Sequence, residues 1–167
     1  HSDSSAASDV YKRQLKMHVF NRARLIKNSK NRIPYGVDLI QKYRRESWIV
    51  FTENKKQAKE FNKIINTKGF KSALYNTDLD SGERLENLNK FKKADLNVLV
   101  TCTALDEGFD MPEADGALIL SASSSKRQRV QRMGRVLRIT ENKPNALIVT
   151  VYSSKTEFDK LMEEAKR

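Results

Sequence analysis

Cysteine, histidine and tryptophan are scarce in this sequence: its 167 residues include one cysteine, two histidines and one tryptophan. With Cys102 as the only cysteine, the chain has neither a disulfide framework nor a cysteine-based zinc cluster. His1 and His18 are the only histidines, so we expect neither a histidine-ligated metal nor a histidine-based catalytic triad. We therefore predict no metal site of the chain's own.

Long apolar runs and a phosphate-binding loop are also missing. No run approaches the roughly 20 apolar residues that a membrane span needs, and the first residues lack the hydrophobic centre of a signal peptide. None of the six glycines is followed by lysine, so the sequence has no Gly-x-x-x-x-Gly-Lys-Ser/Thr loop to cradle nucleotide phosphates. We expect a cytoplasmic protein without a membrane partner.

Positive charge is abundant, with 32 lysines and arginines against 21 acidic residues and a formal net charge of +11. Such a balance favours an acidic partner, and nucleic acid before a membrane. The length fits one domain with a core of its own. Residues 1–14 are rich in Ser, Ala and Asp without apolar periodicity, so we predict a disordered or vector-derived tail there and one domain over 15–167.

Five short apolar runs alternate with stretches whose apolar residues recur at helical spacing. The runs are residues 48–52, 71–75, 96–102, 117–120 and 146–152. Continuous apolar runs of this length are typical of parallel strands that are buried on both faces. We predict an α/β domain of three layers, with a mainly parallel sheet of at least five strands and helices on both faces.

Polar residues mark the expected helix ends. The predicted N-terminal capping pairs are Asn54 with Gln57, Asp80 with Glu83, Ser125 with Gln128, and Ser154 with Glu157. Gly69 is a predicted C-terminal stop. The second of these helices is expected to carry Leu85, Leu88 and Phe91 on one side. Ahead of the first strand, a basic helix over 15–28, a loop over 28–34 and a helix over 37–45 are expected.

The stretch 101–112 follows the third predicted strand, where parallel sheets bind their ligands. Gly108 allows a close backbone approach, and Asp110 is an acceptor suited to a ribose hydroxyl. Thr101 offers a hydroxyl to a nucleic-acid backbone. The alternative is an acidic surface loop.

The stretch 131–138 combines glutamine and arginine at helical spacing. In a helix, Gln131, Arg135 and Arg138 fall at i, i+4 and i+7, on one narrow stripe of the surface. Guanidinium groups bind phosphate oxygens through two parallel bonds and keep their charge at any working pH. The stripe therefore indicates an anion clamp, against the alternative of a solvated basic face.

Taken in order, these segments resemble the second RecA-like domain of superfamily 2 helicases and translocases, over about residues 35–160. Residues 49–52 resemble motif IV, 98–112 resemble motif V, and 131–138 match motif VI in the form QRxGRxxR. Details of motif VI are similar to XPB-type repair helicases and type III restriction subunits. Gln131 and Glu107 stand where DEAD-box proteins carry His and Arg, which favours DNA over RNA.

The resemblance implies roles at the nucleotide. Arg135 and Arg138 would be arginine fingers that reach the γ-phosphate of ATP, and Gln131 would join the network around the attacking water. Asp110 would hold the ribose, with Gly108 allowing close approach. ATP and Mg²⁺ would be held mainly by a separate first RecA-like domain of the same parent protein, so this chain alone is expected to be inactive.

The resemblance also implies contacts with nucleic acid. Thr52, Thr101 and Cys102 would touch its backbone, which positions a strand without reading its sequence. For Arg84, the nucleic-acid face and a role in capping and solvating its own helix both stay open. The predicted function is the C-terminal half of an ATP-dependent DNA helicase or translocase. The alternative is a nucleic-acid binding or regulatory module that kept the fold without ATPase function.

Overall fold

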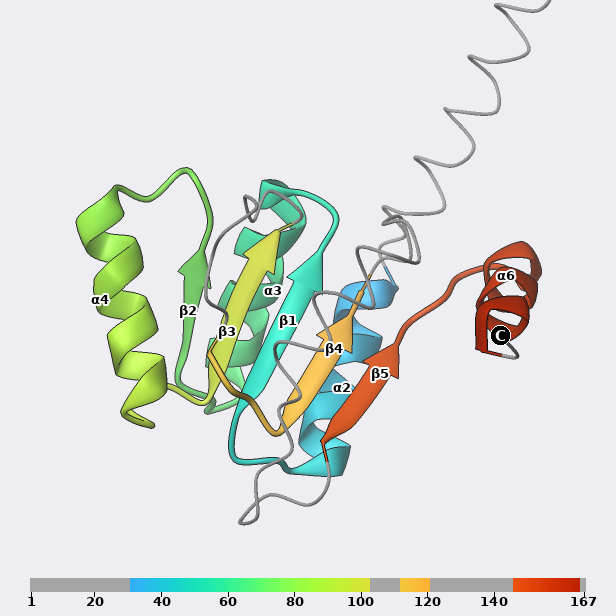
Figure 1. Ribbon diagram of the computed structural model, residues 1–167, viewed down its shortest axis with the longest axis horizontal. Coiled ribbons are helices and arrows are strands. Elements are labelled where there is room, and N and C mark those ends of the chain that lie inside the picture. The colour runs from blue at the N-terminus through green and yellow to red at the C-terminus, as the bar shows by residue number, and fades with distance from the viewer. Residues whose placement is uncertain (1–30, 103–111, 121–145, 166–167) are drawn as a thin grey trace, which may run out of the picture.

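The computed structural model describes residues 31–102, 112–120 and 146–165, and these form one parallel sheet with helices on both faces (Figure 1). Every strand pair in the five-stranded sheet is parallel, in the order β2-β3-β1-β4-β5. The strands are β1 (Trp48–Thr52), β2 (Ser72–Tyr75), β3 (Val98–Cys102), β4 (Gly116–Ile119) and β5 (Leu147–Thr150). The helices are α2 (Arg32–Tyr43), α3 (Lys55–Thr67), α4 (Ser81–Lys92) and α6 (Lys155–Ala165). The predicted fold class is confirmed.

Alternation along the strands divides the core between the two faces of the sheet. Trp48 and Val50 of β1 face a core shared with α2 and α3, whereas Ile49 and Phe51 face a second core shared with α4. All five residues of β1 are buried, because the strand lies at the centre of the sheet. Two covered faces explain why the sequence of β1 is apolar at every position instead of at alternate ones.

Close packing around β1 depends on glycine at two places. A Cβ atom at Gly116, on the neighbouring strand β4, would lie 2.5 Å from the fully buried ring of Trp48. A Cβ atom at Gly36 of α2 would lie 2.6 Å from the side chain of Leu120. Gly116 therefore leaves room for the ring of Trp48 against β4, and Gly36 lets α2 approach the sheet closely. The tryptophan is a core residue.

The predicted capping pair at the start of α3 is confirmed. The side chain of Asn54 accepts a hydrogen bond of 2.9 Å from the backbone N–H of Gln57. The Gln57 side chain in turn accepts one of 2.9 Å from the backbone N–H of Glu53. At the other end, Gly69 adopts a φ of +86°, the left-handed conformation that stops a helix and favours glycine.

The caps of α4 and α6 are also as predicted. Asp80 accepts a 2.8 Å hydrogen bond from the N–H of Glu83, and Ser154 accepts one of 3.2 Å from the N–H of Glu157. The apolar side predicted for α4 is wrong at Leu85, which is 58% exposed while Leu88 and Phe91 are buried. Steps of three residues drift around a helix, so Leu85 lies about 120° away from Phe91.

The loop predicted over residues 28–34 is wrong from Arg32 onward, because α2 already begins there and runs to Tyr43. Pro34 suggested a break, yet it lies in the first turn, where the backbone N–H has no partner within the helix and its loss costs nothing. The expected helix over 15–28 and the Ser125–Gln128 cap lie outside the described residues. Within the described residues, no helix has both the length and the apolar composition to cross a membrane.

A buried arginine joins α2 to α6 and to the carboxyl ends of β4 and β5. Arg32 is 1% exposed, and its guanidinium donates hydrogen bonds to the carbonyl oxygens of Leu120, at 2.6 Å, and Val151, at 3.0 Å. The same group forms an ion pair of 2.5 Å with Glu157 of α6. Arg32 therefore holds together α2, α6 and the ends of β4 and β5.

Candidate functional site

The carboxyl ends of β1, β2 and β3 lie at one edge of the sheet, the upper edge in Figure 1. Three of the predicted nucleic-acid residues meet there, because Thr52 is paired with Cys102 and Phe51 with Thr101 in the register of β1 and β3. The side chains of Thr52, Thr101 and Cys102 are nevertheless at most 4% exposed. The structure brings these residues together but holds their side chains below the surface.

The two threonine hydroxyls at this edge have partners inside the chain. Thr52 Oγ1 lies 3.0 Å from the carbonyl oxygen of Thr101 and 3.2 Å from that of Asn54. Thr101 Oγ1 donates to the carbonyl oxygen of Cys102 at 3.3 Å. Both hydroxyls therefore stabilise the ends of the strands.

Arg84 lies on α4 beside the end of β2. Its Nε atom is buried and has no hydrogen-bond partner among the described residues. Burial raises the pKa of Tyr75, the last residue of β2, and the positive charge of Arg84 acts in the opposite direction, so the two groups are close. The cap of α4 is Asp80, which leaves the guanidinium of Arg84 free of that task.

Asn76 follows β2 directly and is a polar residue that the sequence analysis missed. Its side chain is 4% exposed, and its oxygen accepts a 3.0 Å hydrogen bond from the N–H of Asp78. Its Nδ2 atom has no partner among the described residues. An amide directly after an apolar strand was the available signal, because such residues lie at the ligand-binding edge of a parallel sheet.

A second group that the sequence analysis missed joins α3 to the loop after β2. Lys55 and Lys59 both form ion pairs with Asp78, and the Lys59 Nζ to Asp78 Oδ2 distance is 2.8 Å. Hydrogen bonds from Lys55, and then from Lys59, hold the pKa of the Asp78 carboxyl below its usual value. This edge of the sheet therefore carries several positively charged and hydrogen-bond-donating groups.

The nucleotide-binding predictions concern residues outside those described. Gly108 and Asp110 fall between β3 and β4, and Gln131, Arg135 and Arg138 fall between β4 and β5. Their roles stay predictions.

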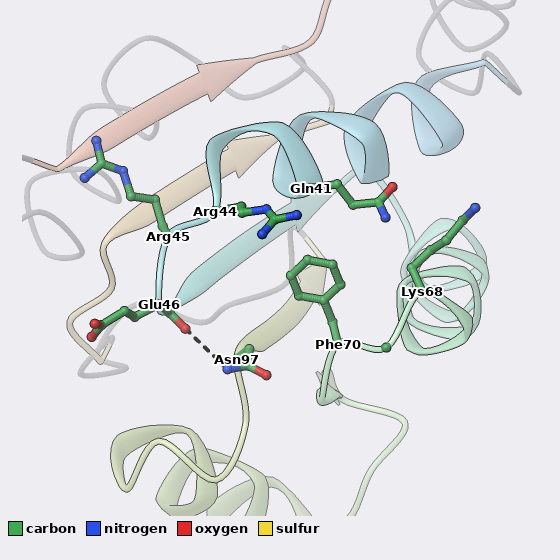
Figure 2. A pocket seen from close by; sticks show the side chains of 8 residues that line it. Gln41, Arg44, Arg45, Glu46, Lys68, Phe70 and Asn97 are labelled. Atoms are coloured by element: carbon green, nitrogen blue, oxygen red, sulfur yellow. Dashed lines mark hydrogen bonds between the residues drawn. The ribbon is translucent and has the colours of Figure 1, made fainter.

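A pocket of about 440 Å³ lies at the opposite edge of the sheet, near the amino ends of the strands (Figure 2). Phe70 lies between Arg44 and Lys68 in it, and Asn97 donates a 3.5 Å hydrogen bond to the carbonyl oxygen of Glu46. Arg44 and Lys68 are the residues that end α2 and α3. Because helix C-termini carry partial negative charge, these cations complement the helices.

Comparison with known proteins identifies the family to which this chain belongs. Residues 31–140 match the helicase conserved C-terminal domain. The chain is 32% identical, over 90% of its length, to the DNA 3'-5' translocase XPB2 of Sulfurisphaera tokodaii, and 30% identical, over 71%, to the UvrABC system protein B of Fusobacterium nucleatum. It spans 33% and 19% of those two proteins.

Solved structures agree on the fold. The C-terminal domain of the DEAD-box protein Dbp5 superposes with a TM-score of 0.72 at 22% identity, covering 84% of this chain and 80% of that one. The chain therefore has the RecA-like fold and belongs to the helicase conserved C-terminal domain family of superfamily 2.

Proposed function

We propose that this chain is the C-terminal half of an ATP-dependent DNA helicase or translocase. The match of residues 31–140 to the helicase C-terminal domain carries the proposal, because this domain is typical of ATP-dependent helicases. The chain lacks a phosphate loop, so the proposal places ATP and Mg²⁺ mainly on a first RecA-like domain of the same parent protein. This half alone is then inactive.

The proposed role of this half at the nucleotide is to supply charge across the cleft between the two domains. Arg135 and Arg138 stabilise the charge that develops on the γ-phosphate, and Gln131 orients the attacking water. Gly108 and Asp110 contact the ribose side. Arginine fingers contribute on the order of 10³–10⁵ in rate in other phosphoryl-transfer systems, so closure of the domains controls hydrolysis.

The proposed nucleic-acid face is the carboxyl edge of the sheet. Arg84 supports it with a buried Nε atom that lacks a partner among the described residues, since such a donor is costly unless a ligand completes it. Thr52, Thr101 and Cys102 are buried at the base of the same edge, so we expect them to support the surface that contacts a bound strand and not to present their hydroxyls to it. Contacts of this kind hold a strand without reading its bases.

DNA is the favoured nucleic acid. Two of the similar proteins are named as a DNA translocase and a UvrABC component, at 32% and 30% identity. An rRNA helicase, RRP3 of Scheffersomyces stipitis, is 25% identical over 71% of the chain. The glutamine at position 131, where DEAD-box proteins carry histidine, supports the same preference.

The alternative is a nucleic-acid binding or regulatory module without ATPase function, which the net charge of +11 and the missing phosphate loop also suit. ATP hydrolysis by the intact parent protein distinguishes the two. We expect single- or double-stranded DNA to stimulate hydrolysis more strongly than RNA of the same length. Stimulation by RNA alone would overturn the DNA assignment, and binding of DNA without any hydrolysis would establish the binding module.

A further inference from the structure

Two lysines one turn apart at the start of α3 share a single carboxylate. Lys55 and Lys59 contact different oxygens of Asp78, in the loop after β2. All three side chains reach solvent, with exposed fractions of 43%, 58% and 33%, respectively. A ligand that approaches the carboxyl edge of the sheet therefore meets both lysines and the carboxylate between them.

The position of the lysines is unfavourable for the helix alone. The N-terminus of a helix carries partial positive charge, and acidic residues are preferred there. The first turn of α3 contains no acidic residue and begins with Lys55. An anion outside the helix offsets this repulsion, and in the free chain that anion is Asp78.

A second observation at the same loop points to a missing acceptor. Asn76 lies two residues before Asp78 and holds the loop through the 3.0 Å bond that its side-chain oxygen accepts from the Asp78 N–H. Its Nδ2 donor is buried without a partner among the described residues. A buried donor left unpaired costs about 1–3 kcal/mol, so the loop that carries Asp78 gains free energy if a shift on ligand binding lets this donor meet an acceptor.

We propose that Lys55 and Lys59 bind a backbone phosphate of the nucleic acid, and that Asp78 occupies them until the phosphate replaces it. This inference rests on the proposed nucleic-acid function and adds to it a phosphate site on α3 with a competing internal anion. Exchange conserves the charge balance, because the carboxylate and a phosphodiester each carry one negative charge.

The energies of the contacts involved favour the replacement of Asp78 by a phosphate. Exposed ion pairs are worth only about 0–1 kcal/mol, so the release of Asp78 costs little. A phosphate that is neutralised by lysine also releases counterions, which favours binding at low salt. The depressed pKa of Asp78 keeps its carboxyl ionised at neutral pH, so the competitor is present under working conditions.

Fluorescence anisotropy with a labelled oligothymidylate, measured across a salt series on the intact protein, tests the proposal. Asp78→Asn removes the competitor and is expected to tighten binding by about three- to ten-fold at low salt, given the charge released. The double variant Lys55→Ala/Lys59→Ala is expected to weaken binding and to lower the salt slope by about 0.7, the value for one single-strand phosphate contact. Asp78→Asn is expected to have no effect in that background.

Glu86→Gln is the matched control, because Glu86 forms an exposed ion pair of 2.6 Å with Lys90 on α4 and its loss changes the net charge equally. Tightening by Asp78→Asn beyond that of Glu86→Gln supports the site. Equal effects of the two variants, or weaker binding by Asp78→Asn, would overturn it while the proposed function stands. If the unaltered protein binds no nucleic acid, the proposed function fails, and this inference fails with it.

Discussion

The hydroxyl of Thr52, at the end of β1, donates a 3.0 Å hydrogen bond to the carbonyl oxygen of Thr101, at the end of β3. The bond links two central strands at the edge where open parallel sheets bind their ligands. Both residues are at most 2% exposed. The polar strand ends that suggest a nucleic-acid site in the sequence thus also hold that edge of the sheet in place.

Replacement of Thr52 by valine removes this bond and keeps the shape of the side chain. We expect Thr52→Val to lower the free energy of unfolding by about 1–3 kcal/mol, because a buried carbonyl loses its partner. Thr52→Ser, which keeps the hydroxyl, isolates the loss of the methyl group. Urea denaturation of the three proteins measures the difference, and a valine variant as stable as the unaltered protein would contradict the structural role.

Arg32 offers a test of the connection between α2 and α6. Arg32→Ala leaves Glu157, which is 16% exposed, and two carbonyl oxygens without the guanidinium. Removal of one partner of a buried ion pair lowers the free energy of unfolding by about 3–5 kcal/mol, and we expect a decrease near the lower end of that range because Glu157 reaches solvent.

Glu157→Gln removes only the negative charge on α6. It is expected to lower the free energy of unfolding by less than Arg32→Ala does, since the hydrogen bonds from Arg32 to the two carbonyl oxygens remain. Thermal unfolding of both variants measures the two effects. Equal destabilisation by both would show that the ion pair, and not the bonds to Leu120 and Val151, dominates.

The pKa of Tyr75 reports on Arg84. Burial raises this pKa above its ordinary value of 10.0, while the charge of Arg84 lowers it. The folded state therefore holds its phenolic proton more tightly than the unfolded state, and stability falls as pH rises above the ordinary value. Arg84→Ala is expected to raise the pKa of Tyr75 further and to steepen this alkaline loss.

Ultraviolet titration of the phenolate measures that shift, with Tyr75→Phe to assign the signal and Arg84→Lys to keep the charge. An unchanged titration in Arg84→Ala would show that the two groups are not close.

Local signals predicted most of the fold. The apolar runs locate all five strands, and Asn54, Asp80 and Ser154 mark the helix starts because capping depends on residues only three positions apart. The start of α2 was missed because Pro34 is compatible with both a break and a first turn. Neither the strand order nor the packing of Trp48 on Gly116 could be predicted, since both join distant segments.

The candidate site was predictable where a motif lies within one segment. Thr52, Thr101 and Cys102 were expected at the carboxyl edge and do lie there, but their burial depends on neighbouring strands that sequence spacing does not reveal. The Lys55, Lys59 and Asp78 group joins residues that lie 19 to 23 positions apart, with no pattern to connect them. Contacts of this kind become visible only in three dimensions.

The central claim is that this half supplies arginine fingers to an ATPase, and Arg138→Ala in the intact parent protein tests it most directly. The measurement is DNA-stimulated ATP hydrolysis together with DNA affinity, with the exposed Lys92→Ala as a control for lost positive charge. We predict that Arg138→Ala lowers stimulated hydrolysis by about 10³-fold or more, while DNA affinity stays within a few-fold and Lys92→Ala hydrolyses normally. Normal turnover by Arg138→Ala would contradict the account.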